Sequence, residues 1–216
     1  MTSKTTKKSS KRSYTGLSVE ERKLVRKECF LDAGLEVFGK AGIRRATVRK
    51  LCKEAQLTER YFYESFEDSE ALFCAVYEKQ VDVLRNEFVA KLPDLPEELE
   101  HCIRVCLDLY FSLMRDERVV RVLYVESLLG IDKVDAVRQA NNDVMAHFAA
   151  HWMKQDNPDL NVTFEFASSV SMGINGACFS MATQWMLGGY GVPQEVLVES
   201  CSLLVRGTMR ELTKKN

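Results

Sequence analysis

Several kinds of signal are missing from this sequence of 216 residues. No stretch alternates apolar and polar residues as a half-buried strand would, and no hairpin signal appears. The N-terminus lacks the apolar core of a signal peptide. The three histidines form no triad-like or metal-spaced set with matching acids, although His147 and His151 stand four apart. These absences predict an all-α, cytoplasmic protein that is not an enzyme and holds neither metal nor cofactor.

Cysteine is present, but its pattern argues against disulfides. The seven cysteines are odd in number, scattered and mostly on apolar helix faces. This is typical of small core residues in a reducing cytoplasm. Cys102 and Cys106 stand four apart beside His101, a spacing that a soft-metal or thiol sensor could use. No other Cys/His cluster supports that alternative.

Charged residues are absent from residues 166–194. The length would permit a membrane span, but seven polar side chains make the segment too polar for easy insertion. We therefore expect a helix buried on nearly all sides, with one stripe meeting a partner subunit and the other the interior. The small stripe is Ser169, Gly173, Gly176 and Ser180, and the bulky one is Val170, Ile174, Cys178, Met181 and Trp185.

Charge is divided unevenly along the chain. Residues 1–72 hold 16 basic and 11 acidic side chains, and the remainder holds 14 and 20, within a net charge of −1. A basic N-terminal third joined to an acidic body fits a domain that faces phosphates and a second domain that does not.

The sequence predicts two short helices separated by a turn over residues 47–66. Thr47 is a good N-cap for the first helix, Gln56 and Leu57 interrupt, and Thr58 can cap the second. Many proteins place the second helix of such a pair in the DNA major groove, although an ordinary helical hairpin shares the pattern. The buried face of the first helix is expected to hold Val48, Leu51, Cys52 and Ala55.

Residues 22–78, about a quarter of the chain, resemble the DNA-binding domain of TetR-family transcriptional regulators. The family implies an all-α protein with a three-helix helix-turn-helix domain followed by a helical ligand-binding and dimerisation domain. The segments that carry the resemblance are Cys29–Phe38, the turn Ala41–Ile43, the helix Thr47–Ala55, Tyr63 and Phe66 of the recognition helix, and Glu70–Leu72 of a fourth helix.

The resemblance also implies roles for individual residues. Thr47 and the N-terminus of its helix would meet a phosphate, and Tyr63 aligns with a phosphate-contacting tyrosine of the family. Arg60 and Tyr61 would reach base edges, where an arginine can pair with guanine. Arg49 could contact either a phosphate or a base. The expected DNA-binding residues are Arg44, Arg45, Thr47, Arg49, Lys53, Thr58, Arg60, Tyr61 and Tyr63.

Some features depart from the family pattern. Gln56 stands where glycine is common, so a left-handed backbone angle there would be less comfortable. Ser69 replaces a lysine that frequently touches phosphate. Acidic residues within 64–70 should weaken nonspecific affinity, which the basic arm 1–19 could offset by lying along the groove. The arm could equally be a solubilising tail.

Helix spacing and breaks predict the domain limits. They are a flexible arm over 1–19, the helix-turn-helix domain over 20–68, a connecting helix and Pro-containing linker over 69–96, and the ligand-binding and dimerisation domain over 97–216. Besides the helix-turn-helix pair, helices are expected at 20–41, 69–91, 97–115, 117–129, 133–155, 163–188 and 194–213.

TetR-like bodies commonly hold a ligand pocket between the helices that follow the linker. An apolar or aromatic ligand is expected here, because no arginine or lysine cluster offers an anion site and Arg118 and Arg121 should be solvated. Each candidate could instead belong simply to the core. The candidate lining is Cys106, Tyr110, Met114, Tyr124, Phe148, Trp152, Asn175, Cys178, Phe179 and Trp185.

In the family, the charge-free helix and the final helix of two subunits form a four-helix dimer interface. A homodimer would present paired recognition helices to an inverted-repeat operator in double-stranded DNA. The expected interface residues are Ser169, Gly173, Gly176, Ser180, Val196, Cys201, Leu204 and Val205.

The leading hypothesis is a homodimeric repressor that a small molecule releases from a palindromic operator. The alternatives are an architectural or protein-responsive DNA-binding regulator without a small-molecule ligand, and an enzyme with an incidental helix-turn-helix. Repression rather than activation is taken from the family.

Overall fold

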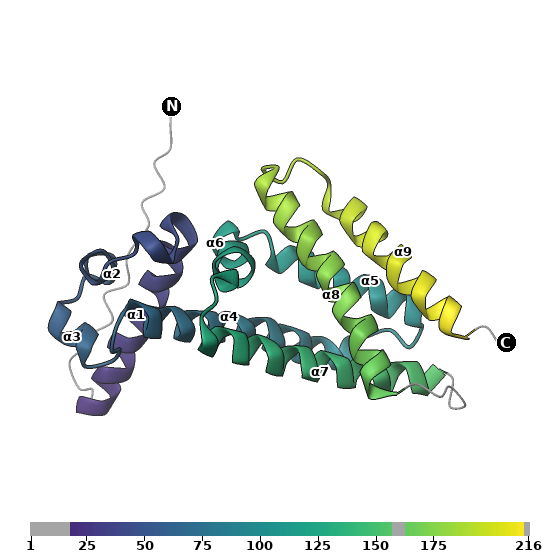
Figure 1. The fold of residues 1–216 in the computed structure, drawn as a ribbon, viewed down its shortest axis with the longest axis horizontal. Helices are drawn as coiled ribbons and strands as arrows, with labels where there is room; N and C mark the ends of the chain where they lie inside the picture. The colour runs from purple at the N-terminus through teal and green to yellow at the C-terminus, as the bar shows by residue number, and fades with distance from the viewer. Residues whose placement is uncertain (1–17, 157–162, 214–216) are drawn as a thin grey trace.

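The computed structural model describes residues 18–156 and 163–213, of which the side chains of 148–156, 212 and 213 are not placed. The described chain is helical and contains no strand, as expected for the all-α class (Figure 1). The elements are α1 (Val19–Ala41), η1 (Ile43–Arg45), α2 (Val48–Ala55), α3 (Glu59–Tyr63), α4 (Ser69–Lys91), η2 (Leu92–Asp94), α5 (Leu99–Leu113), α6 (Glu117–Val120), η3 (Arg121–Val125), η4 (Glu126–Leu128), α7 (Asp132–Asp156), α8 (Phe164–Leu187) and α9 (Gln194–Thr213).

Capping residues in the sequence explain where several helices begin. Ser18 and Glu21 form a reciprocal capping box at the start of α1. Asp68 accepts the Ala71 N–H at 2.7 Å ahead of α4, and Thr163 accepts the Phe166 N–H at 3.3 Å ahead of α8. Each bond satisfies a donor that a helix N-terminus leaves unpaired.

The N-terminal part, residues 18–68, is called the head. It lies at one end of the elongated molecule, with α8 and α9 toward the other (Figure 1). Its centre is aromatic: the ring of Phe30 meets those of Phe62 and Phe66 edge-on at 5.3 and 6.3 Å between centroids. Phe30, Phe62 and Leu51 are completely buried, so α1, α2 and α3 share one core.

Helix α4 leaves the head and runs beside α7 along the body, which is the name used for residues 97–213 (Figure 1). Pro93 lies in the short helix η2, where the chain turns back into α5. Packing does not stop at this turn, because the buried apolar residues form one continuous cluster from Phe30 to Cys201. The domain limits given above remain a prediction.

The prediction of a single helix at 117–129 is wrong. This segment is one α-helical turn, a π-helix at Arg121–Val125 and a 3-10 turn. The Ser127 hydroxyl donates to the Leu123 carbonyl at 2.5 Å within it. Short π-helical turns are rare and frequently occur at functional sites.

In the body, α7 packs against α8 and α9 packs chiefly along α5. Ion pairs join α9 to α5 through Glu199 with Arg104 and Arg206 with Glu100. Among the helices that the structure describes, none combines the length and apolar character needed to cross a membrane.

Candidate DNA interface and effector core

Thr47 begins α2 as predicted. Its hydroxyl accepts the Lys50 N–H at 3.3 Å, and the Lys50 ammonium donates to the Arg45 carbonyl at 2.8 Å. These two bonds join η1 to the first turn of α2. Thr58 begins α3 through its carbonyl, which accepts the Tyr61 N–H at 3.0 Å, while its exposed hydroxyl makes no capping bond.

The turn between α2 and α3 contains the left-handed backbone conformation that the sequence analysis expected to be unfavourable at Gln56. Gln56 lies in the left-handed region at φ 55° and ψ 36°. The next residue closes α2 by donating its N–H to the Cys52 carbonyl at 3.0 Å. A left-handed side-chain-bearing residue costs roughly 1–2 kcal/mol relative to a right-handed one.

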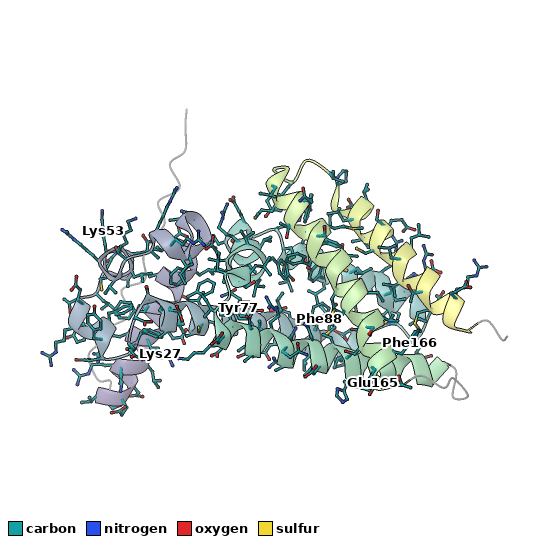
Figure 2. The ribbon with its side chains drawn as sticks, in the orientation of Figure 1. Lys27, Lys53, Tyr77, Phe88, Glu165 and Phe166 are labelled. Atoms are coloured by element: carbon teal, nitrogen blue, oxygen red, sulfur yellow. The ribbon has the colours of Figure 1, made fainter. Side chains whose placement is uncertain are left out.

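Four of the expected phosphate contacts are exposed cations of η1 and α2: Arg44, Arg45, Arg49 and Lys53. None of them has an ion-pair partner within the part of the chain whose side chains are described. Lys53 lies on the side of the head remote from α8 and α9 (Figure 2). Exposed cations without an ion-pair partner can meet phosphates without first breaking an internal contact.

The residues expected to read bases are placed differently from one another. Arg60 is exposed, but its Nε lies 3.2 Å from Glu64 Oε1, and the other Glu64 oxygen lies 3.4 Å from Arg26. Tyr61 is half-buried, with the Arg26 guanidinium 4.4 Å from its ring centroid. Arg60 therefore reaches the surface, whereas Tyr61 packs against α1 and is only partly accessible.

Tyr63 is 59% exposed, and its ring rests edge-on against Phe62 with the centroids 5.4 Å apart. The hydroxyl is therefore presented from a ring that the head core supports. This arrangement suits a positioned phosphate donor.

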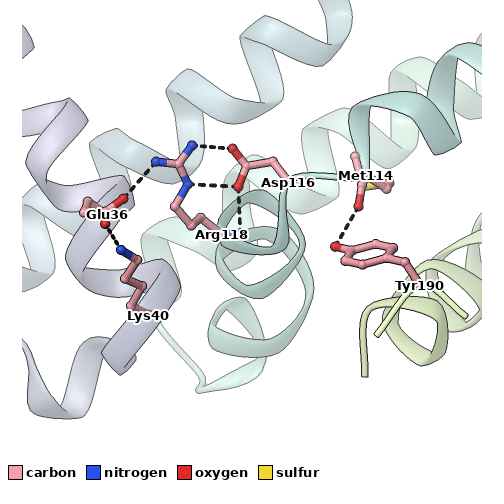
Figure 3. Close-up of polar contacts among 6 residues, drawn as sticks. All are labelled: Glu36, Lys40, Met114, Asp116, Arg118 and Tyr190. Carbon is pink, nitrogen blue, oxygen red and sulfur yellow. Dashed lines mark hydrogen bonds and ion pairs between the residues drawn. The ribbon is translucent and has the colours of Figure 1, made fainter. Parts of the chain in front are cut away.

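A contact between the head and α6 was missed by the sequence analysis. A Cβ atom at Gly39 would lie 2.4 and 2.6 Å from Arg118 Cβ and Cα, so only glycine permits this approach of α6 to α1. The Arg118 guanidinium lies 2.8 Å from Glu36 Oε2 and 2.5 Å from Asp116 Oδ2, so it pairs with both carboxylates (Figure 3). Lys40 and Arg118 hold the pKa of Glu36 below its usual range.

The expectation that Arg118 and Arg121 are solvated is therefore wrong. Arg118 bridges two segments through its carboxylate partners. Arg121 pairs with Glu117 at 3.6 Å, and its buried Nε has no hydrogen-bond partner among the described residues.

Glu126 provides a second contact between body and head. Its Oε2 accepts the N–H of Ile43, the first residue of η1, at 3.0 Å. Gly42 allows this approach: its φ is +75°, and a Cβ atom there would lie 2.7 Å from Glu126 Oε1. A carboxylate of the body thus caps the short helix that precedes α2.

Part of the expected ligand lining converges in the body. The hydroxyls of Tyr110 and Tyr124 are 2.9 Å apart, and the Tyr124 ring meets Phe179 edge-on at 4.8 Å. Burial raises the pKa of Tyr124 to about 12 and that of Tyr110 well above its usual value. Asn175 is half-buried on α8, and Cys178 is buried on the same helix.

Other expected lining residues belong to a structural cluster at the α8–α9 turn. Trp185 packs against Phe111 and Tyr190 and donates its Nε1–H to the Val192 carbonyl at 2.7 Å. The buried Met114 accepts the Tyr190 hydroxyl at its carbonyl (Figure 3). Phe148 and Trp152 lie outside the described side chains.

A groove of about 510 Å³ lies elsewhere, between the end of α4, α5 and α9. Of the expected ligand residues whose side chains are described, none lines it, and both carboxylates and cations surround it. On α5, burial and the neighbouring Cys102 raise the pKa of Cys106 to about 12, which does not favour a reactive thiolate. Among the described residues, no group of three or more His, Cys, Asp or Glu side chains could hold a metal ion.

The expected dimer residues are largely exposed. Ser169, Gly173, Gly176 and Ser180 form an accessible stripe on α8, and among the described residues no atom outside the local helix backbone lies within 4 Å of a Cβ added at either glycine. On α9, Val196 and Leu204 are exposed and Val205 is half-buried. Cys201 is the exception: it is 1% exposed and faces the chain's own interior, so its assignment to a subunit interface is wrong. Exposed apolar residues that the sequence analysis missed extend this surface, namely Phe166, Met172, Leu187 and Leu203.

Residues 30–76 match the family model described as bacterial regulatory proteins, tetR family. A comparison with curated protein sequences gave no match. Solved structures share the fold. The fatty acid degradation regulator FadR from Bacillus halodurans has a TM-score of 0.71 and 15% identity, with 83% of this chain and 94% of that chain covered.

FadR from Bacillus subtilis in complex with stearoyl-CoA gives a TM-score of 0.69 at 17% identity, covering 83% of this chain and 98% of that chain. A putative transcriptional regulator from Pseudomonas aeruginosa PAO1 gives 0.72 at 16% identity, covering 90% and 93%. The family model and the shared fold confirm the resemblance to TetR-family regulators that the sequence predicted.

Proposed function

We propose, from the premise that the N-terminal domain is of the TetR type, that this chain is a non-enzymatic, homodimeric transcriptional regulator acting in the cytoplasm. It binds an inverted-repeat operator through α2 and α3 and leaves it when an apolar effector occupies the body. The observation that carries the proposal is the family match over residues 30–76, which contain the exposed, unpaired cations Arg44, Arg45, Arg49 and Lys53.

The proposed DNA contacts are of two kinds: contacts to phosphates, which position the protein on DNA, and contacts to base edges, which read the sequence. Arg44 and Arg45, with Thr47 at the start of α2, suit phosphate oxygens because they are exposed beside a helix N-terminus, and Lys53 is an exposed cation in the last turn of the same helix. Tyr63 offers its hydroxyl in the same way, and the exposed Thr58 hydroxyl is not used to cap α3.

Arg60 is the proposed base reader. It must exchange the Glu64 carboxylate for a base edge, so Glu64 competes with DNA for its guanidinium. Arg49 is exposed in the first turn of α2 and remains a candidate for either a phosphate or a base.

Selection of DNA from a random pool at near-physiological salt tests this part. An enriched inverted repeat supports a dimeric, sequence-specific regulator, whereas binding that vanishes with salt and enriches no motif refutes it. Arg60→Ala should then cost about 1–3 kcal/mol of DNA-binding free energy and relax the preference at one base position of the motif. Lys53→Ala should lower by about 1 the slope of log affinity against log salt concentration, without changing the motif. Arg85→Ala, on α4 and paired with Asp82, is the matched loss of one charge outside the head.

A homodimer through α8 and α9 is supported by the exposed small and apolar residues of both helices. Gly173→Ala tests whether Gly173 packs in the proposed dimer interface, separately from its effect on folding of the protomer. Alanine favours a helix by about 1 kcal/mol over glycine, and the added methyl has open space among the described residues of the protomer, so protomer stability should rise. Close helix packing by a second copy would make the same methyl weaken self-association. Sedimentation equilibrium that shows unchanged association would remove Gly173 from the interface.

The effector site is proposed around Tyr110, Tyr124, Asn175 and Phe179. These residues keep some accessible surface, although burial raises the pKa of both phenols. We propose that these half-buried groups border a recess between α5, the π-helix and α8 that an effector can enter. Its aromatic character, with the paired phenols as polar groups, suits an apolar or aromatic ligand.

The fatty-acid regulators that share this fold support an acyl chain as the first effector class to test. Long-chain fatty acids, stearoyl-CoA and aromatic acids should be compared by thermal shift and by release of operator DNA. A ligand that stabilises the protein and lowers DNA affinity supports this proposal. Protein that binds its operator but responds to none of these classes would favour the alternative, a regulator without a small-molecule ligand.

The route from effector to DNA is proposed to be the α6–η3–η4 segment. Tyr124 of its π-helix faces the proposed recess, while Arg118 and Glu126 of the same segment hold α1 and η1. A ligand that prefers another arrangement of Tyr124 would shift the population toward a different head orientation. The shift is limited to its differential affinity for the two states.

A further inference from the structure

Two cysteines that the sequence assigned to different sites meet in the interior. Cys178 of α8 and Cys201 of α9 have their Sγ atoms 3.6 Å apart, and Cys201 Sγ lies 3.3 Å from Met181 Sδ. Both cysteines are free thiols, and they are 8% and 1% exposed. Neither is needed for the proposed DNA contacts, so the pair calls for its own explanation.

The pair is already close to bonding geometry. A disulfide has an S–S length of about 2.05 Å, so the sulfurs must approach by about 1.5 Å from their separation of 3.6 Å. The two residues stand on different helices and face each other across one contact. A small adjustment of side chains or helices can therefore close the bond.

We propose that Cys178 and Cys201 form an oxidation site, at which a hydroperoxide converts the dithiol into an intrachain disulfide that ties α8 to α9. The Cys201 thiolate attacks the terminal oxygen of the hydroperoxide, the O–O bond breaks, and an alcohol or water leaves. Cys178 then attacks the resulting sulfenic sulfur. The S–S bond forms, the S–O bond breaks, and the hydroxyl leaves as water with the Cys178 proton. Two thiols lose two electrons in total, and the hydroperoxide gains them.

The surroundings of the two thiols favour disulfide formation over oxidation to sulfinic or sulfonic acid. The hydrogen bond that Cys178 donates lowers the pKa of Cys201 and raises that of Cys178 itself, so the two thiols have distinct roles. Hydrogen peroxide is small and uncharged, which suits access to a nearly buried site. The disulfide is neutral, whereas sulfinic or sulfonic acids would place a charge in the core.

Cys102 and Cys106 provide an internal comparison. They stand four apart on α5, but the pKa of Cys106 is raised by burial and by Cys102 rather than lowered. The same reagent applied to the same protein therefore compares two cysteine pairs. Preference for Cys178 and Cys201 would reflect the cross-helix pairing and not cysteine proximity alone.

The test treats the reduced full-length protein with hydrogen peroxide under native conditions in the presence of a chelator. Remaining thiols are alkylated, and non-reduced peptides are mapped by mass spectrometry. We expect a linked peptide containing Cys178 and Cys201, lighter by two hydrogen atoms, before other cysteines are oxidised. Closing this loop should raise Tm by roughly 6–12 °C, and a reductant should reverse the rise.

Matched variants complete the test. Protein carrying Cys102→Ala and Cys106→Ala should still form the link, and protein carrying Cys178→Ala and Cys201→Ala should show neither link nor shift. Oxidation of other cysteines first, with Cys178 and Cys201 alkylated only after denaturation, would overturn the proposal. The decisive mapping uses the unmodified sequence and no DNA, so it depends neither on the folding of a variant nor on the regulatory function.

Discussion

Glu126 provides a sharp test of how the body holds the head. Its carboxylate accepts the Ile43 N–H at 3.0 Å in a partly buried position, and no residue of η1 can replace it. A hydrogen bond to a charged group contributes about 1.5–3 kcal/mol. Glu126→Ala should lower the free energy of unfolding by that amount. Glu126→Gln retains an oxygen acceptor without the charge, so it should lose about half as much.

The assay is urea unfolding at one fixed protein concentration, because the proposed dimerisation would make apparent stability depend on concentration. Glu117→Ala is the matched control: it removes a glutamate from the same segment, but one that is 62% exposed and paired with Arg121 at 3.6 Å. An exposed pair contributes about 0–1 kcal/mol. The control should therefore cost less than Glu126→Ala.

Hydrogen exchange gives a local measurement of the same bond. Losing 1.5–3 kcal/mol of protection should speed exchange of the Ile43 amide roughly 10- to 150-fold in Glu126→Ala. Amides elsewhere in the head, such as that of Leu51, should change less. If Glu126→Ala cost no more than Glu117→Ala and left the Ile43 amide protected, Glu126 would not hold the head.

Three further variants test other parts of the structure. Lys40 and Arg118 lower the pKa of Glu36 from 4.5. Ionised Glu36 therefore stabilises the folded protein above pH 4.5, and this stabilisation is lost as the pH falls through the lowered pKa. Glu36→Gln should show a smaller acid-induced drop in the urea midpoint than the unmodified protein. Gln56→Gly should raise the free energy of unfolding by about 0.5–1 kcal/mol by relieving the left-handed strain, whereas Gln56→Ala should not. Gly39→Ala should cost about 1–3 kcal/mol in urea unfolding, because its Cβ would overlap backbone and Cβ atoms of Arg118; an unchanged midpoint would contradict the close approach of α6 to α1.

The head could be predicted because its signals are local. Thr47, Gln56 and Thr58 mark the ends of α2 and the start of α3 within a dozen residues, and the aromatic spacing fixes the buried side of each helix. Phe62 and Phe66 of this aromatic pattern are buried in the core. Helix spacing likewise predicted most of the body, since caps and breaks act over one or two turns.

The errors arose where the answer depends on distant partners. Periodicity placed Cys201 on an apolar face of α9, but it could not show whether Cys178 or a second subunit covers that face. Arg118 looked like a solvated cation because its partner Glu36 is 82 residues away along the chain. The π-helical turn was missed because its residues are compatible with an ordinary α-helix.

That turn has a mechanical consequence for the proposed coupling. Each residue of an α-helix advances the direction of side chains by about 100°, and a π-helical turn contains an additional residue. Conversion of Arg121–Val125 to regular helix would therefore rotate Tyr124 and Glu126 relative to their present partners. The contacts with Tyr110 in the body and Ile43 in the head could not both survive that rotation. An effector that displaced Tyr124 would therefore act on a segment whose contacts reach both the proposed recess and the head.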